Sequence, residues 1–413
     1  MDVVHTRCAG LDISKKDAKV CVRVVGGSGR AKTVETVTTW ASMTRQILSL
    51  RDHLVKQQVT CVVMEATGDY WKPFYYLLED LPGVELMLVN ARHVKTLPGR
   101  KTDVADATWL AQLAAHGLVR GSFVPPPPVR QLRDLTRART AITRERSREI
   151  QRLEKLLEDA GIKLSAVASD INGVSGRLML EALIAGQRDP AILADLAKAR
   201  LRVKIPALTE ALTGRFGEHH AFLARLHLDL IDQHTAALDR ITSRIEKLME
   251  PFRGFHDLIC TIPGISTIIA DVIVAETGAD MTRFPTAKHL ASWAGTTPGN
   301  NESAGKKKSS RTRPGNPYLQ GALGVAAMVC ARDPQTYLGA RYRRIASRRG
   351  PLRANVAVQH SILTTIWHMG TTGTLYDDPG GDYFTRLNPG RAKTRAVRQL
   401  EAMGYHVTLE QAS

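Results

Sequence analysis

The amino-acid sequence predicts an α/β domain at the N-terminus, a long helical arm and a mainly α-helical C-terminal region. Three observations support this division. Short apolar stretches alternate with helical periods over the first 124 residues, and a run of four prolines follows at 125–128. Apolar residues then recur at helical spacing through long charged stretches. A chain of 413 residues is also too long for a single core, so several domains are expected.

The N-terminal domain is expected to begin with three short strands within residues 3–37. In the second, over residues 18–24, apolar and polar residues alternate, which is typical of an antiparallel strand with one buried face. A helix is expected over about residues 40–56. Two continuously apolar stretches, 59–65 and 84–90, are typical of central strands covered on both faces.

Helices follow each of these two strands. The stretch YWKPFYYLLED is expected to be helical after its proline, and another helix is expected from about Asp103 to His116. The expected order is therefore three meandering strands, then helix, strand, helix, strand and helix. The ribonuclease-H-like fold has this order. The prolines at 125–128 are expected to end the domain, because consecutive prolines fit neither a helix nor a central strand.

Two long amphipathic helices are expected after the prolines. Apolar residues recur at helical spacing over residues 132–157, with Gly161 as the expected C-cap, and again over 223–248, ending before Pro251. About 60 mainly helical residues separate the two stretches, which indicates an antiparallel coiled-coil arm. A plain helical bundle is the alternative. The expected parts are therefore residues 1–124, 125–254, 255–370 and a tail at 371–413.

The C-terminal region is helical and basic. Residues 301–353 hold twelve Lys or Arg against two acids. Residues 258–278 have the form of a helix-hairpin-helix, with Pro263 and Gly264 as the tight turn. Such hairpins can offer backbone N–H groups to a phosphate, which positions nucleic acid without reading its sequence. The alternative is an ordinary helical hairpin in a core.

Composition and charge indicate the kind of partner. The chain carries a net charge of +17, which favours a polyanion. No stretch approaches the ~18 apolar residues of a membrane-spanning helix, and the N-terminus lacks the pattern of a signal peptide. Nucleic acid in the cytoplasm is therefore expected as the partner, rather than a membrane. The cysteines are odd in number and far apart, which predicts buried, reduced thiols rather than disulfides or a zinc site: Cys8, Cys21, Cys61, Cys260 and Cys330.

Four carboxylates of the N-terminal domain are candidates for a metal site. Asp12 and Glu65 each end an apolar strand, and Asp103 and Asp106 share one face of a helix because they lie three residues apart. Four acids at one edge of a sheet would repel one another unless cations lay among them, and Mg²⁺ prefers such oxygen ligands. Two metal ions ~4 Å apart can bind both the attacking and the leaving oxygen of a phosphodiester. Basic residues just before the helix suit phosphate contacts: Arg92, Lys95, Arg100 and Lys101.

Each acid also has an ordinary alternative. Aspartate is common where strands stop, and a D-x-x-D near a helix start often reflects capping and dipole effects. The stretch GLDIS could instead open the phosphate loop of an actin-like or sugar-kinase ATPase. Such a loop needs glycine after the aspartate so that the backbone can approach phosphate, and DISKKDAK offers lysines instead. A metal-dependent, nuclease-like site is the hypothesis that accounts for all four acids together.

A loop rich in glycine, asparagine and cations is expected over residues 295–317. Its last two residues, Asn316 and Pro317, are expected as the N-cap and first residue of the next helix. Three serines lie in this loop among five cations: Ser303, Ser309 and Ser310 with Lys306, Lys307, Lys308, Arg311 and Arg313. A serine is a poor nucleophile unless activated, whereas Lys and Arg can stabilise charge that develops on a phosphate. The chemistry alone favours a solvated phosphate-binding loop.

Five motifs together resemble those of a known family. They are GLDISK, VVMEATGDYW, RKTDVADATWLAQL, IPGIST and WAGTTPGNNESAGKKKSSRTRPGNPYL. The set is similar to the DEDD-type insertion-sequence transposases, the family numbered one hundred and ten, and it spans residues 5 to about 370. The last motif is long and specific.

The resemblance implies a defined site. In this family the N-terminal domain is similar to RuvC-like Holliday-junction resolvases, and its acids bind Mg²⁺, with Mn²⁺ as an alternative. By motif they correspond to Asp12, Glu65, Asp103 and Asp106. A serine of the C-terminal domain attacks DNA and holds it as a phosphoserine intermediate, and by motif position that serine is Ser303. Many relatives have two glycines after this serine, whereas this chain has Ala304 and Gly305. Ser309 and Ser310 lie close by in the sequence and are the alternative nucleophiles.

The resemblance also implies partners. Family members use a noncoding bridge RNA, encoded beside the gene, that pairs with donor and target DNA while the protein reads shape and backbone. They act as homodimers, joined through the arm into a dimer of dimers, in the bacterial cytoplasm at the nucleoid. The expected function is a DNA transposase and recombinase that excises and inserts a mobile element. A metal-dependent, structure-specific endonuclease that hydrolyses DNA and an inert nucleic-acid-binding protein are the alternatives.

Overall fold

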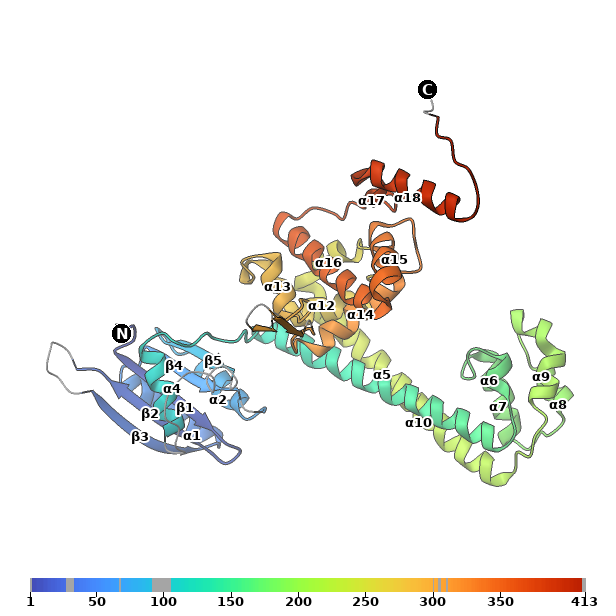
Figure 1. The fold of residues 1–413 in the computed structure, drawn as a ribbon. Helices are drawn as coiled ribbons and strands as arrows, with labels where there is room; N and C mark the ends of the chain where they lie inside the picture. The colour runs from blue at the N-terminus through green and yellow to red at the C-terminus, as the bar shows by residue number, and fades with distance from the viewer. Residues whose placement is uncertain are drawn as a thin grey trace. The chain divides into compact units, whose positions relative to one another are not determined.

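A computed structural model describes residues 2–26, 33–66, 68–90, 105–299, 301–303, 306–309 and 311–410. The chain forms two compact units, Met1–Pro125 and Pro126–Ser413 (Figure 1). The boundary between them lies in the proline run at 125–128. The finer division of the second unit at residues 254 and 370 stays a prediction.

The first unit is built on one mixed sheet of five strands in the order β3-β2-β1-β4-β5. Its strands are β1 (Arg7–Ile13), β2 (Asp17–Val24), β3 (Val34–Ala41), β4 (Cys61–Glu65) and β5 (Glu85–Val89). Strand β2 pairs antiparallel with β1 and β3, whereas β4 and β5 run parallel to β1. The expected α/β domain, with three meandering strands followed by two further strands, is confirmed.

Helices cover both faces of this sheet. Helices α1 (Thr44–Lys56) and α2 (Trp71–Leu78) pack on one face, where Phe74 and Leu11 are fully buried in a common apolar cluster. Helix α4 (Ala105–Ala115) packs on the other face, where its apolar side chains form a second buried cluster with β1, β4 and β5. Each sheet face therefore has its own core.

Two expected element boundaries in this unit are wrong. Trp40 belongs to β3 rather than to the following helix, because it pairs with Ala18 of β2 and so continues the ladder. Helix α2 begins before Pro73 rather than after it. Proline fits the first turn of a helix, where the missing N–H has no intrahelical partner to lose.

Two long helices, α5 (Pro127–Asp159) and α10 (Glu218–Met249), lie side by side in opposite directions in the second unit (Figure 1). Two side-chain contacts show their antiparallel register: Glu149 Oε2 lies 2.9 Å from His227 Nδ1, and Asp159 Oδ2 lies 3.1 Å from His220 Nε2. The expected pair of long helices is confirmed, and its coiled-coil form stays a prediction. The prolines at 127 and 128 lie in the first turn of α5, so the expectation that they exclude helix is wrong for the reason that applies to Pro73.

Short helices fill the chain between the two long ones, as expected. They are α6 (Leu164–Val167), α7 (Val174–Ile184), α8 (Pro190–Asp195), the 3-10 helix η1 (Ala199–Lys204) and α9 (Ile205–Ala211). They lie at one end of the pair and enclose an apolar core with it (Figure 1). Gly161 follows α5 with a φ of 74°, the conformation expected of a residue that caps a helix end.

The C-terminal part of the second unit is mainly helical, as predicted. Its elements are η2 (Glu250–Phe252), α11 (Arg253–Cys260), α12 (Thr267–Thr277), η3 (Met281–Arg283), α13 (Ala287–Trp293), β6 (Asn301–Ser303), β7 (Lys306–Ser309), α14 (Pro317–Cys330), α15 (Tyr337–Arg349), α16 (Pro351–Thr372), α17 (Tyr383–Leu387) and α18 (Pro389–Ala402). One apolar core joins α11, α12, α14 and α16 with the adjoining ends of α5 and α10. All five cysteines are free thiols, as predicted. Four of them are buried as expected, whereas Cys260 is partly exposed.

Candidate active site

Asp12 and Glu65 lie next to each other where two parallel strands end. The register of β1 and β4 pairs Leu11 with Met64. The following residues, Asp12 and Glu65, therefore extend from neighbouring strands at the same level. Both carboxylates are half-buried.

The two acids point to the face of the sheet that α4 covers. Side chains alternate along a strand, so Asp12 shares its face with Cys8 and Gly10. The Cys8 Sγ donates a hydrogen bond to the carbonyl oxygen of Ala111 in α4, at 3.2 Å. A Cβ added to Gly10 would lie 2.2 Å from the carbonyl oxygen of Ala107 in the same helix. Glycine therefore lets α4 lie directly on β1.

The same contacts give the direction of α4. Residue 8 of β1 contacts Ala111 of α4, and residue 10 contacts Ala107. Residue numbers fall along the helix as they rise along the strand, so α4 runs antiparallel to β1. Its first turn, with Asp106, therefore lies near the end of β1, beside Asp12 and Glu65. The structure brings three of the four predicted acids to one edge of the sheet.

Several predicted residues lie outside the described part of the chain. These are Asp103 and the basic residues that precede it: Arg92, Lys95, Arg100 and Lys101. Their roles stay predictions.

A second group of possible metal-binding atoms lies at the opposite edge of the sheet. His5, Cys61 and Glu85 each offer one such atom, and the three atoms lie within 4.8 Å of one another. Cys61 and Glu85 begin β4 and β5, whereas the acids lie where strands end. Burial raises the pKa of the Cys61 thiol to about 12, so the thiol stays protonated near neutral pH. Metals bind the thiolate, so a metal ion at this group would have to displace the Cys61 proton.

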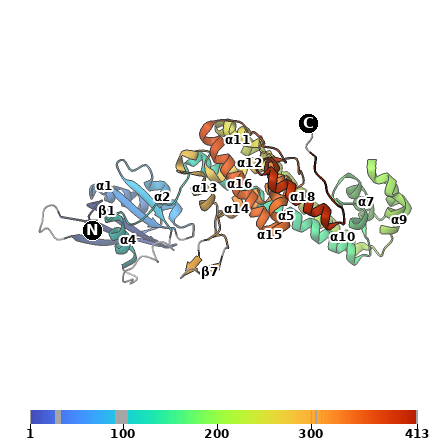
Figure 2. The same cartoon turned by 45° about the horizontal axis from the view of Figure 1, so that its top comes forward.

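The predicted serine loop contains a short hairpin, which the sequence did not indicate. Strands β6 and β7 pair antiparallel, and Ser303, the last residue of β6, pairs with Lys306. Strand β7 extends away from the helices near α13 and α14 (Figure 2). Its residues include Lys306, Lys307 and Lys308.

The base of this hairpin is closed by backbone contacts. Pro298 and Thr312 form an isolated bridge, and the N–H of Gly299 donates to the carbonyl oxygen of Arg311 at 3.0 Å. The side chains of Arg311 and Arg313 are exposed, as phosphate contacts require. The exposed Ser309 accepts a hydrogen bond from the N–H of Arg311 with its hydroxyl oxygen, and Ser310 lies outside the described residues.

The expected N-cap after the hairpin is confirmed. The Asn316 Oδ1 accepts hydrogen bonds from the N–H groups of Tyr318 and Leu319, both at 3.1 Å, and Pro317 is the first residue of α14. Asparagine and proline suit these positions because one supplies an acceptor and the other lacks an N–H that would have no partner.

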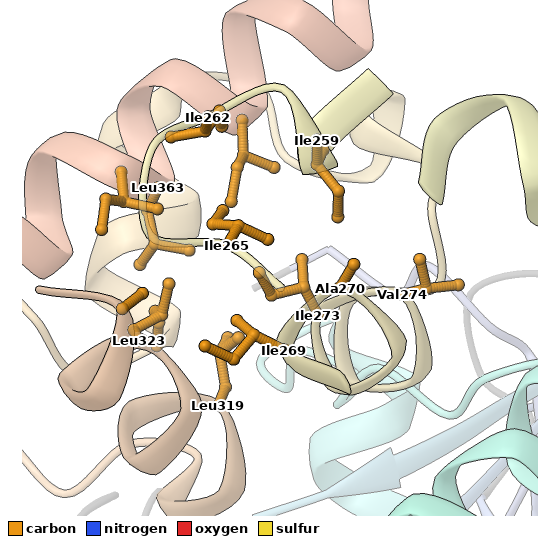
Figure 3. Close-up of a cluster of buried hydrophobic side chains, with 14 of the residues drawn as sticks. Ile259, Ile262, Ile265, Ile269, Ala270, Ile273, Val274, Leu319, Leu323 and Leu363 are labelled. Carbon is orange, nitrogen blue, oxygen red and sulfur yellow. The ribbon is translucent and has the colours of Figure 1, made fainter. Parts of the chain in front are cut away.

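The turn between α11 and α12 packs inward. Gly264 has a φ of 84°, and a Cβ there would lie 2.7 Å from the carbonyl oxygen of Ala326 in α14. The Cys330 Sγ donates to the carbonyl oxygen of Pro263 at 2.9 Å. Figure 3 shows the isoleucines of this hairpin, among them Ile259, Ile262 and Ile265, in one buried cluster with Leu319, Leu323 and Leu363. These contacts favour the core-hairpin alternative, and phosphate binding by Pro263 and Gly264 stays a prediction.

Sequence reasoning missed two buried acids of α12. Glu276 is fully buried and Asp271 is 9% exposed, and each pairs with arginines of α5. An acid inside the apolar run TIIADVIVAET was the available signal, because a buried carboxylate needs a partner.

Comparison with known proteins identifies the family. Residues 9–162 match the model of the DEDD transposase domain of IS110 elements, described as "Transposase", and residues 256–343 match a model described as "Transposase IS116/IS110/IS902 family". The chain belongs to the IS110 family of transposases. The first match spans the four acids, and the second contains Ser303 and the cations around it.

This IS110-family transposase is also similar to a curated protein of Sinorhizobium fredii (strain NBRC 101917 / NGR234), which is named "Putative transposase y4pF/y4sB". The two are 25% identical over 334 residues, which cover 79% of this chain and 76% of the relative. A transposase acts on DNA, in keeping with the expected partner. Among the described residues, none of the helices combines the length and apolar character needed to cross a bilayer.

Proposed function

We propose that this transposase moves its element by breaking and rejoining DNA through a covalent link to Ser303. The observation that carries the proposal is the gathering of Asp12, Glu65 and Asp106 where β1 and β4 end. Carboxylates at one strand edge supply the oxygen ligands that Mg²⁺ prefers. The strand order β3-β2-β1-β4-β5 also supports the ribonuclease-H-like, RuvC-like interpretation of this unit.

Mg²⁺, or Mn²⁺ in its place, would be held by the three acids together with Asp103. The donor set fits a hard divalent cation, because Asp12, Glu65 and Asp106 are half-buried carboxylates on one side of the sheet. A bound cation would supply positive charge beside the scissile phosphate. Asp106 lies in the first turn of α4.

The serine hairpin supplies the proposed bond exchange. The Ser303 Oγ attacks phosphorus and gives up its proton, an Oγ–P bond forms, and the bond from phosphorus to one deoxyribose oxygen breaks as that oxygen is protonated. For rejoining, the hydroxyl of another DNA end attacks the phosphoserine and releases Ser303. Each step exchanges one phosphate ester for another, so no ATP is consumed. Nearby cations would bind the phosphates and stabilise the developing charge: Lys306, Lys307, Lys308, Arg311 and Arg313.

The proposed partners are donor DNA, target DNA and a noncoding bridge RNA, whose phosphate backbones the protein would bind. The net charge of +17 supports this, as do exposed arginines on α15 and the adjoining start of α16: Arg343, Arg344, Arg348, Arg349 and Arg353. A homodimer, or a dimer of dimers joined through α5 and α10, would bring acids and serine from different protomers together. Phe222 and Leu226 on α10 are 71% and 46% exposed, which favours an interface there.

The test is a search for the covalent intermediate. The protein is expressed with its flanking noncoding RNA, incubated with element-junction DNA and Mg²⁺, and run on a denaturing gel that separates protein–DNA adducts from free DNA. Ser303→Ala, a Ser309→Ala/Ser310→Ala double variant and Asp12→Asn run alongside. We expect an adduct with the wild type and the double variant, and none with Ser303→Ala or Asp12→Asn.

Other outcomes separate the alternatives. Cleaved DNA that never carries protein and is indifferent to Ser303→Ala would mean a metal-dependent endonuclease. Binding that persists in all variants without cleavage would mean a nucleic-acid-binding protein. An adduct that disappears only in the double variant would move the nucleophile to Ser309 or Ser310.

A further inference from the structure

The carboxylate of Glu276 is the centre of a buried polar network in the second unit. Glu276 lies near the end of α12 and is fully buried. The Arg137 guanidinium donates to it through two nitrogens, Nε at 2.8 Å from Oε1 and Nη2 at 2.9 Å from Oε2. The Arg133 Nε lies 3.2 Å from Oε2, and the Asn316 Nδ2 donates to Oε2 at 2.6 Å.

This network joins three helices. Arg133 and Arg137 come from α5, and Arg133 also donates to the backbone carbonyl oxygens of Ala275 and Glu276, at 3.2 and 2.8 Å. The Arg137 guanidinium also lies over the ring of Tyr318 in α14, 4.6 Å from its centroid. Burial alone would lower the pKa of Arg137, but the hydrogen bonds and charge of Glu276 raise it above its usual value, so Arg137 stays charged.

Asn316 connects this network to the serine hairpin. Its Oδ1 caps α14, and its Nδ2 binds Glu276, so one side chain is fixed from both sides. Gly295 and Gly315 lie at the two ends of the segment that contains the serine hairpin. A Cβ on Gly315 would lie 2.2 Å from the carbonyl oxygen of Ala294, so the backbone at the two ends of this segment is in close contact. The Gln320 Nε2 donates to the carbonyl oxygens of Ala294 and Gly295, at 2.8 and 3.1 Å.

We propose that Glu276 is a positioning residue that holds the base of the serine hairpin against the arm helix α5 by way of Asn316. The inference rests on the proposed function, because the hairpin matters for the reaction only if Ser303 attacks DNA. These polar contacts, rather than packing alone, set the position of the hairpin base: two guanidinium groups and one amide converge on a single carboxylate.

The chain offers a matched control one and a half turns earlier on α12. Asp271 accepts a hydrogen bond from the Arg139 Nη1 at 2.8 Å and lies 3.2 Å from the His256 Nε2. This pair joins the same helices, α5 and α12, and its other partner lies on α11 rather than on α14. Asp271→Asn therefore weakens the same helix interface without changing the contact to the hairpin base.

The experiment uses Glu276→Gln, Asn316→Asp, the double variant of both, and Asp271→Asn in the full-length protein. Asn316→Asp keeps the capping oxygen but removes the N–H that Glu276 accepts. The double variant restores the hydrogen bond between residues 276 and 316 with donor and acceptor exchanged, but the amide nitrogen that Glu276→Gln introduces then faces the arginine donors that approach Oε2 in the wild type. Amide hydrogen exchange is measured by mass spectrometry over residues 295–322, together with the rate of adduct formation and DNA affinity.

We expect both single variants to speed exchange over this segment and to slow adduct formation by roughly tenfold, with DNA affinity unchanged. The double variant is expected to recover part of the losses of Asn316→Asp, because it removes the repulsion between two facing carboxylates while Arg133 and Arg137 stay without their carboxylate partner. Asp271→Asn is expected to match the wild type in this segment. Unchanged exchange in the single variants, an equal loss in Asp271→Asn, or no recovery in the double variant would overturn the proposal. A wild type that forms no adduct would overturn the proposed function instead, and the exchange data would still decide the role of Glu276.

Discussion

The Cys61 thiol links the stability of the first unit to pH. Burial raises its pKa from 9.0 to about 12, so the unfolded chain loses this proton at lower pH than the folded chain does. The stabilisation of the folded state by this difference in pKa is complete below pH 9 and is lost as the pH rises toward 12. We expect the thiol to lower the free energy of unfolding by about 1.4 kcal/mol per pH unit in that window. Urea denaturation at several pH values measures this slope, and a Cys61→Ala variant with the wild-type slope would contradict the prediction.

Single residues also show what the sequence could predict about the site. Asp12, Glu65 and Asp106 were predictable because strand ends and helix starts are local patterns in the chain. The role of Glu276 was not, because its partners Arg137 and Asn316 lie 139 and 40 positions away. Only tertiary packing brings such groups together, and no spacing rule in one sequence pairs them.

At the scale of elements, the contact between α4 and β1 places Asp106 beside Asp12. A Cβ on Gly10 would meet the backbone of α4 at 2.2 and 2.4 Å, and backbone cannot yield as a flexible side chain can. We expect Gly10→Ala to displace α4, to lower the free energy of unfolding by about 2 kcal/mol, and to reduce adduct formation. Gly121→Ala is the control, since its Cβ would meet only the Met87 side chain, at 3.6 Å. Equal stability of the two variants in urea denaturation would show that α4 can move without cost.

Elements were predicted best where their pattern is long. The two long helices follow from apolar spacing over many turns, whereas the ends of β3 and α2 depend on a pairing partner and on the position of Pro73 within its first turn. The hairpin of β6 and β7 was missed because seven residues of mainly polar sequence carry no apolar alternation. Backbone pairing alone defines it.

At the scale of the whole molecule, the proposed reaction uses groups from both units. The acids belong to the first unit, Met1–Pro125, and Ser303 belongs to the second, Pro126–Ser413. A recombinase must also hold two DNA partners at once, which calls for more than one copy of each group. Assembly through the long helices would meet this requirement.

If copies of the chain assemble through α10, making the exposed apolar face of α10 polar should lower the molar mass of the assembly. Phe222 and Leu226 lie one turn apart on α10, and both are exposed although they are large and apolar. We expect a Phe222→Ser/Leu226→Ser variant to have a lower molar mass than the wild type by light scattering after size-exclusion chromatography. Leu375→Ser, at a residue 70% exposed in the C-terminal tail, is expected to keep the wild-type mass. A wild type that is already monomeric, or a double variant of unchanged mass, would remove α10 from the interface.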